Sequence, residues 1–206
     1  MSNFEIGLDF VENEVTLIDR LQVGSEEAFE SLVHLYQAPV YNIAFRVLGD
    51  PAEACDAVQE TFMKVYKGIK TFRGECGLRT WIYKIAISSS LNRQRWWKRW
   101  RNHAPISLDE PFSLPDGAFG EHELADSWPN PESSLAKIET EQAVQRALNM
   151  LDFDYRIVIV LRDIEGFSYD EISDILKISL GTVKSRLWRA RQALKKELQP
   201  LVNGKE

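Results

Sequence analysis

Apolar residues recur every three or four positions along most of the chain, which is the spacing of one buried face of a helix. The first clear stretch runs from about Leu17 to Leu48 and predicts a helical pair that ends at Gly49. Pro39 lies inside this stretch, and we expect it to kink or interrupt the helix because proline lacks an amide donor. No convincing run of alternating strand residues is found. The pattern therefore predicts an all-α fold.

A second helix is predicted to begin at Pro51, because Asp50 can cap it and proline suits the first helical position. Glu53 lies where a capping box needs an acid. The apolar face of this helix consists of Ala54, Val58, Phe62, Val65 and Ile69. A loop with two glycines follows at 72–77, and another helix is predicted from about Leu78 to Arg101.

The segment 104–131 has five prolines, many acids and little periodicity, so it predicts a flexible acidic linker. The linker divides the chain into two small helical domains, at 15–103 and 132–203. In the second domain, helices are predicted at about 132–151, 154–164, 168–176 and 180–197.

The last two of these helices have the pattern of a helix-turn-helix. Ser168 and Glu171 can form a capping box, and residues 177–179 form the turn. The apolar stripe of the final helix is Val183, Leu187, Ala190 and Leu194. Its outward face is Lys184, Ser185, Trp188, Arg189 and Gln192, flanked by Arg186 and Arg191. Such a face suits the major groove of DNA, although a solvated basic helix is the alternative.

Charge is segregated along the chain, although the net charge is −6. Residues 77–102 include seven basic residues and no acid, and residues 182–196 include six basic residues and no acid. Acids dominate between these blocks. Two basic patches on one chain indicate two contacts with a single polyanion.

The first basic block also carries aromatic residues, namely Trp81, Tyr83, Trp96, Trp97 and Trp100. Aromatic rings among cations are typical of proteins that bind unstacked bases of single strands. Two alternatives stay open: Trp81 belongs to the core, or the tryptophan cluster anchors the chain at a membrane interface.

Other classes of protein find less support. No apolar run is long enough to span a membrane, and the N-terminus lacks the pattern of a secretory signal, so we expect a cytoplasmic protein without stable membrane insertion. Cys55 and Cys76 make no metal-ligand pattern, and we expect neither a disulfide nor a cofactor. We expect no catalytic residues and no metal site, although Glu53, Asp56 and Glu60 leave a metal-dependent nuclease as an alternative. A dimeric helix-turn-helix regulator is the second alternative, and it requires an N-terminal sensing domain with a βα pattern.

Four segments resemble the sigma factors of bacterial RNA polymerase, in particular the extracytoplasmic-function group of the sigma-70 family. They are Asp56–Phe62, Thr71–Gly74, Arg79–Ala86, and Gly166–Ile172 leading to 181–191. The resemblance implies that 15–103 is sigma region 2, which binds polymerase and melts the −10 element. It implies that 132–203 is sigma region 4, which reads the −35 element as duplex.

The resemblance also implies roles for individual residues. Polymerase contacts would be Asp56, Gln59, Glu60 and Phe62. Contacts to the −10 element would be Phe72, Arg73, Thr80, Trp81, Lys84, Ser88, Asn92 and Arg93. Contacts to the −35 element would be Thr182, Lys184, Ser185, Arg186, Trp188 and Arg189. The implied partners are the clamp helices and flap of core RNA polymerase, promoter DNA and an anti-sigma factor. Ser88 departs from the asparagine of several members, and the cluster of Trp96, Trp97 and Trp100 matches no family role.

Overall fold

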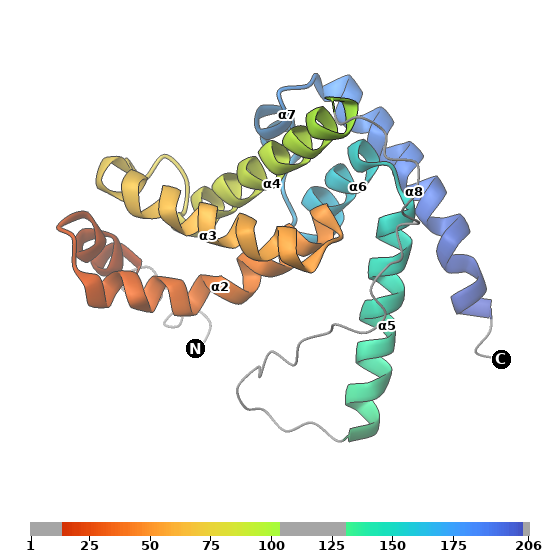
Figure 1. Ribbon diagram of the computed structural model, residues 1–206, viewed down its shortest axis with the longest axis horizontal. Coiled ribbons are helices and arrows are strands. Elements are labelled where there is room, and N and C mark those ends of the chain that lie inside the picture. The colour runs from red at the N-terminus through yellow and green to blue at the C-terminus, as the bar shows by residue number, and fades with distance from the viewer. Residues whose placement is uncertain (1–13, 104–130, 204–206) are drawn as a thin grey trace, which may run out of the picture.

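The computed structural model describes residues 14–103 and 131–203, and within these ranges every regular element is a helix (Figure 1). This confirms the predicted all-α fold. The predicted linker lies outside the described residues, except that Pro131 already begins a helix.

The N-terminal helices form a small bundle. A helix over residues 14–22 precedes α2 (Glu26–Leu48), α3 (Pro51–Gly68), the short η1 (Ile69–Thr71) and α4 (Leu78–His103). α2, α3 and α4 pack against one another in pairs. Fully buried side chains at their centre include Leu32, Ile43, Ile82 and Ile87. Burial of such apolar side chains is the main stabilising contribution of the bundle.

Of the two effects expected of Pro39, the interruption of the first helical stretch is wrong, and the kink stays a prediction. α2 runs without a break through Pro39, and the chain turns earlier, at Gly24 with φ +86°. Proline removes one intrahelical bond, to the carbonyl of Leu35. Leu32, Tyr36 and Val40 are buried on either side of it, so packing holds the helix together there.

Local capping signals set the start of α3. Gly49 ends α2 in the left-handed region with φ 78°, as predicted. The Asp50 carboxylate accepts a hydrogen bond from the Glu53 amide at 2.9 Å, which caps α3 at the predicted place. The Glu53 carboxylate is bonded to Arg93 of α4, so the predicted capping box is present only in its Asp50 half.

The C-terminal helices are α5 (Pro131–Met150), α6 (Phe153–Ile159), the π-helix η2 (Val160–Ile164), α7 (Tyr169–Leu176) and α8 (Leu180–Asn203). The predicted helix over 154–164 is therefore α-helical only in its first part. α8 is longer than predicted, because Pro200 in its last turns removes a single intrahelical bond and does not end it.

The two groups of helices pack directly against each other and share one apolar core. α2 contacts α6 and η2, and α4 contacts α7 (Figure 1). The Arg156 guanidinium donates to the Val47 carbonyl at 3.3 Å, and the Gln145 amide donates to the Phe45 carbonyl at 3.3 Å. The C-terminal end of α2 is therefore the main contact point of the C-terminal helices.

Candidate nucleic-acid interface

α7 and its turn place α8 at the surface. The Ser168 hydroxyl accepts from the Glu171 amide at 3.2 Å, and the Glu171 carboxylate accepts from the Ser168 amide at 2.9 Å. This is the predicted capping box. These bonds hold the pKa of Glu171 below its ordinary value. Lys177 then takes the left-handed region with φ 55°, and the Ser173 hydroxyl closes the turn by donating to the Ile178 carbonyl at 2.6 Å.

α8 has one buried and one exposed face, as its periodicity predicts. Val183, Leu187 and Ala190 are almost fully buried. The exposed residues of the opposite face include Lys184, Ser185, Trp188, Arg189 and Gln192. Trp188 is 65% exposed, which is unusual for an indole without a partner to cover it. Their outward direction is confirmed, and their contact with DNA stays a prediction.

The first turn of α8 is tied down by hydroxyl groups. The Ser179 hydroxyl accepts from the Thr182 amide at 3.2 Å and lies 2.9 Å from the Thr182 hydroxyl. The Ser185 hydroxyl donates to the Thr182 carbonyl at 3.0 Å. Thr182 therefore helps to fix the first turn of α8. The Ser185 hydroxyl must break its hydrogen bond to the Thr182 carbonyl before it can donate to a base.

The arginines of α8 fall into two groups. Arg186 is paired with Asp154 at 2.7 Å, and Arg191 is paired with Asp163 through two bonds of 2.6 and 2.9 Å. The Asp163 carboxylate raises the pKa of Arg191. Within the described ranges, no ion pair involves Lys184 or Arg189. Lys184 and Arg189 can therefore bind an anionic ligand without first breaking an ion pair.

The loop before α4 is held against the N-terminal helices. The Gln22 amide donates to the Phe72 carbonyl at 2.8 Å, and the rings of Phe72 and Trp81 lie 5.0 Å apart. Trp81 is partly buried and packs on the core, so the core alternative holds for much of its ring. A Cβ on Gly68 would lie 3.1 Å from the Trp81 ring, so the ring would have to shift by a few tenths of an ångström to accommodate a larger residue. Arg73 is exposed beside this aromatic pair.

The face of α4 predicted to bind DNA changes in exposure along its length. Ser88 and Asn92 are exposed, whereas Thr80 and Lys84 are half-buried. Lys84 lies close enough to Glu171 of α7 to lower the pKa of that carboxyl. Part of this face is therefore turned toward the helix-turn-helix.

Arg93 differs from the other predicted DNA contacts, because two carboxylates hold it. Its guanidinium bonds to Glu53 at 2.6 Å and to Asp56 at 2.7 Å, and these partners raise the pKa of Arg93. A residue predicted to touch DNA thus contacts a residue predicted to touch polymerase. Sequence reasoning missed this contact because the two residues lie on different helices.

The other predicted polymerase contacts also divide by exposure. Gln59 is exposed, and Glu60 is partly exposed and pairs with Lys64 at 2.6 Å. Phe62 is only 8% exposed and packs within the core. Because a buried ring cannot touch a partner, we leave Phe62 out of the candidate surface.

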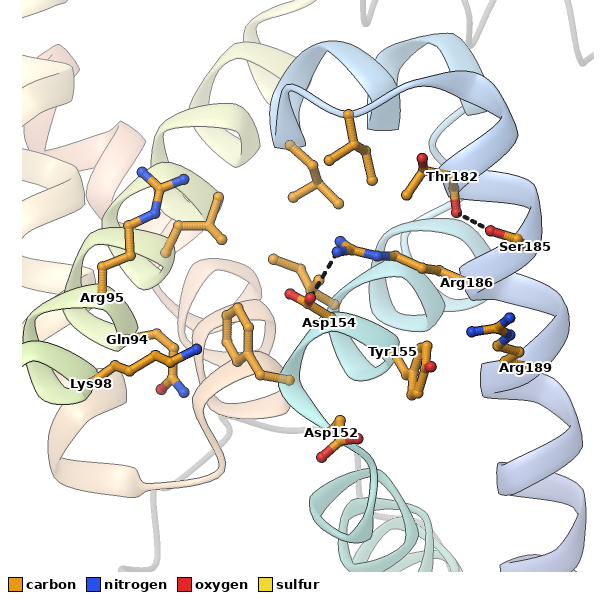
Figure 2. A pocket seen from close by; sticks show the side chains of 15 residues that line it. Gln94, Arg95, Lys98, Asp152, Asp154, Tyr155, Thr182, Ser185, Arg186 and Arg189 are labelled. Carbon is orange, nitrogen blue, oxygen red and sulfur yellow. Dashed lines mark hydrogen bonds and ion pairs between the residues drawn. The ribbon is translucent and has the colours of Figure 1, made fainter. Parts of the chain in front are cut away.

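A cavity of about 1040 Å³ lies between α4 and α8 (Figure 2). Gln94, Arg95 and Lys98 line it from α4, and Thr182, Ser185, Arg186 and Arg189 line it from α8. Asp152, which directly precedes α6, and Asp154 and Tyr155 of α6 lie between these two sides in the close view. Arg95 and Lys98 were part of the basic block seen in the sequence, but nothing in the sequence indicated that they face α8. The two cationic surfaces therefore border one groove.

Within the described ranges, no group of three or more His, Cys, Asp and Glu side chains could hold a metal ion. No helix there has both the length and the apolar character needed to cross a bilayer.

Comparison with known proteins follows the same division of the chain. The model of sigma-70 region 2 matches residues 32–102, and the model of sigma-70 region 4 matches residues 141–194. The RNA polymerase sigma-H factor of Pseudomonas aeruginosa is 36% identical over 191 residues, which cover 93% of this chain and 96% of that protein. The ECF RNA polymerase sigma-E factor of Escherichia coli is 34% identical over 186 residues, covering 90% and 94%.

A solved structure agrees with these sequence matches. It is the sigma factor RpoE from Bartonella quintana in complex with the anti-sigma factor NepR. The match has a TM-score of 0.57 and 27% identity, and it covers 83% of this chain and 96% of that one.

Proposed function

The chain belongs to the sigma-70 family of bacterial RNA polymerase sigma factors, in its extracytoplasmic-function group, and we propose that its two helical domains divide promoter recognition between them. The chain is a sigma factor that directs promoter-specific transcription. Its family is not a family of enzymes, and we extend this to the absence of catalytic activity in this chain. We assign region 2 to 15–103, the linker to 104–131 and region 4 to 132–203.

We assign recognition of the −35 element to the exposed face of α8. The exposure of cations on this face is the observation that carries the proposal. Lys184 and Arg189 are exposed cations that form no ion pair within the described ranges, and Ser185 lies between them on the same face. Arginine and lysine recognise guanine edges and phosphates in the major groove. Thr182, Arg186 and Trp188 complete the surface, with Arg186 still paired to Asp154.

We assign the −10 element to α4 and the loop before it. Arg73 of the loop and Ser88 and Asn92 of α4 are exposed. Half-buried Phe72, Thr80, Trp81 and Lys84 lie beside them. Capture of an unstacked base offsets a melting cost of about a few kcal/mol per flipped base. Cations beside the strand add attraction to its phosphates.

We assign binding of the polymerase clamp helices to the exposed side of α3, which carries Asp56, Gln59 and Glu60. Arg93 joins this surface to α4 and acts first as a positioning residue, because Glu53 and Asp56 already bind its guanidinium. Region 4 would bind the polymerase flap. Since the solved relative was crystallised with an anti-sigma factor, we propose such a protein as a further partner. A chain that works on polymerase acts in the cytoplasm.

The test is run-off transcription by core polymerase with this chain on a genomic promoter library. We expect new start sites that depend on the chain, and loss of these starts when Lys184 and Arg189 are changed to glutamate. Arg146→Glu, an exposed change on α5, is the matched control and should leave the starts in place. The assignment would be refuted if the chain failed to associate with core polymerase. It would also be refuted if the same start sites were used after Lys184 and Arg189 were both changed to glutamate. The dimeric regulator is not favoured, because the N-terminal half matches sigma region 2.

A further inference from the structure

We propose that Trp188 reads a thymine of the −35 duplex, through contact between its indole ring and the C5-methyl group of that base. The inference rests on the proposed function of α8 as the helix that reads this element. Trp188 is 65% exposed, and no other Phe, Tyr or Trp side chain that the structure describes is exposed to the same extent. Val183 and Leu187 take the buried face of α8, so the ring belongs to the outward face.

The ring is accessible while the two groups of helices are packed together. The groove between α4 and α8 is lined from α8 by Thr182, Ser185, Arg186 and Arg189, and Trp188 does not line it. Within the part of the chain that the structure describes, neither a ring–ring contact nor a cation–π contact involves Trp188. A ligand can therefore reach the indole without displacing another side chain from it.

Thymine is the base whose edge in the major groove is complementary to an aromatic ring. In a duplex the faces of the bases are stacked on one another, so a protein side chain reaches only the edges. The edges in the major groove carry hydrogen-bond donors and acceptors, and the C5-methyl group of thymine is the apolar group among them. An exposed indole on a helix that lies in this groove therefore favours an A·T pair opposite the ring.

Polar side chains flank the ring along α8. Lys184 and Ser185 precede Trp188 by four and three residues, so the three side chains lie on one side of the helix. Arg189 follows Trp188 directly, and all of these side chains are exposed. Lysine, serine and arginine can bond to base edges and phosphates on either side of the methyl group. The face therefore combines one apolar contact with several polar ones, as a mixed sequence of base pairs requires.

Other ligands match the ring less well. Stacking of a whole base on the indole requires an unpaired base, whereas a helix-turn-helix binds its target as duplex. The centre of a protein–protein interface is depleted of charged residues. The neighbours of Trp188 on the outward face of α8 are instead exposed and polar, namely Lys184, Ser185, Arg189 and Gln192. The surroundings of the ring thus favour the edge of a base pair.

The experiment replaces thymine by deoxyuridine, which removes the C5-methyl group and leaves the hydrogen bonds of the base pair in place. Core polymerase loaded with this chain is titrated with −35 duplexes in which one thymine at a time, on either strand, is replaced. We expect one position at which the replacement lowers the affinity of the wild type by about 3- to 10-fold. Trp188→Ala should lose at least this factor on the unmodified duplex and should not respond to deoxyuridine at that position.

Trp188→Phe should keep the response to deoxyuridine, because a phenyl ring can also contact the methyl group. Met150→Ala is the matched control, since Met150 is a 72% exposed apolar residue on α5, and it should leave the deoxyuridine profile unchanged. The thymine contact would be overturned, and the proposed function left intact, if the wild type responded to no replacement or had the same profile as Trp188→Ala. Failure of the wild-type holoenzyme to bind any −35 duplex would overturn the proposed function itself.

Discussion

Arg46 of α2 and Glu165, which follows η2, form an ion pair of 3.4 Å between the N-terminal and C-terminal helices. The Glu165 side chain is only 8% exposed, whereas Arg46 is 34% exposed. Burial raises the pKa of Glu165, and Arg46 and Arg79 oppose this effect only in part. Burial therefore destabilises the ionised carboxylate of Glu165 by more than Arg46 and Arg79 stabilise it.

This balance predicts how stability depends on pH. Because the folded pKa of Glu165 is raised, its contribution is most favourable below its ordinary pKa of 4.5 and declines as pH rises through the folded value. Glu165→Gln should therefore be at least as stable as the wild type at pH 7, with the gain vanishing in acid. Arg46→Met should lower stability at pH 7 by about 1–3 kcal/mol, because it leaves a buried carboxylate unpaired. Urea unfolding of all three proteins at several pH values measures these differences. A larger loss for Glu165→Gln than for Arg46→Met would contradict the argument.

Arg156 predicts a second effect at the same interface. Its guanidinium donates to the carbonyls of Val47, Asn149 and Leu151 at 3.0 to 3.3 Å, and burial lowers its pKa. Lysine presents a single ammonium group and cannot reproduce this fork. Arg156→Lys should lower the free energy of unfolding by about 1–3 kcal/mol. Arg146→Lys, an exposed change on α5, should shift it by no more than about 0.5 kcal/mol. Similar values for the two variants in thermal or urea unfolding would show that the fork adds no stability.

Arg189 predicts a change in DNA sequence preference. Arg189→Ala should weaken binding of the holoenzyme to −35 duplex by about 1–3 kcal/mol and relax the preference at one base pair. Binding to a panel of −35 variants at fixed salt measures both quantities. Lys196→Ala, at an exposed position two turns farther along α8, serves as the control for loss of charge alone. A uniform loss across the panel would instead assign Arg189 to a phosphate.

Replacement of Pro39 is predicted to increase the stability of the folded chain. Pro39→Ala restores an amide donor to the Leu35 carbonyl and removes the clash of the proline ring, so unfolding should cost about 1–2 kcal/mol more. Thermal unfolding measures the change, with Gln37→Ala at an exposed position of the same helix as the control. No gain over this control would mean that α2 already compensates for the missing bond.

Features set by neighbouring residues were predictable from the sequence. The capping box of Ser168 and Glu171 and the end of α2 at Gly49 are local signals, and the structure has both. The faces of α8 followed from helical periodicity, because one stripe of apolar residues must be buried.

Features that depend on distant residues were not predictable. Glu165 reads as a surface acid beside a glycine, yet α2 covers it. Arg93 reads as one cation in a basic block, yet two acids from α3 bind it. Continuation of α2 through Pro39 also depends on packing from other helices. Each of these outcomes requires knowledge of which helices meet, and periodicity within one helix does not supply it.

The groove shared by α4 and α8 sets a requirement on promoter geometry. Elements centred near −10 and −35 lie about 25 base pairs apart, which is roughly 85 Å along B-form DNA. Helices that border a single cavity of about 1040 Å³ cannot reach both elements at once. If α4 and α8 read these elements as proposed, the contact between α2 and α6 must separate on the promoter. About 27 residues connect α4 to α5, and the covalent limit for that many residues is roughly 90 Å. This limit is large enough to permit the separation of the two groups of helices.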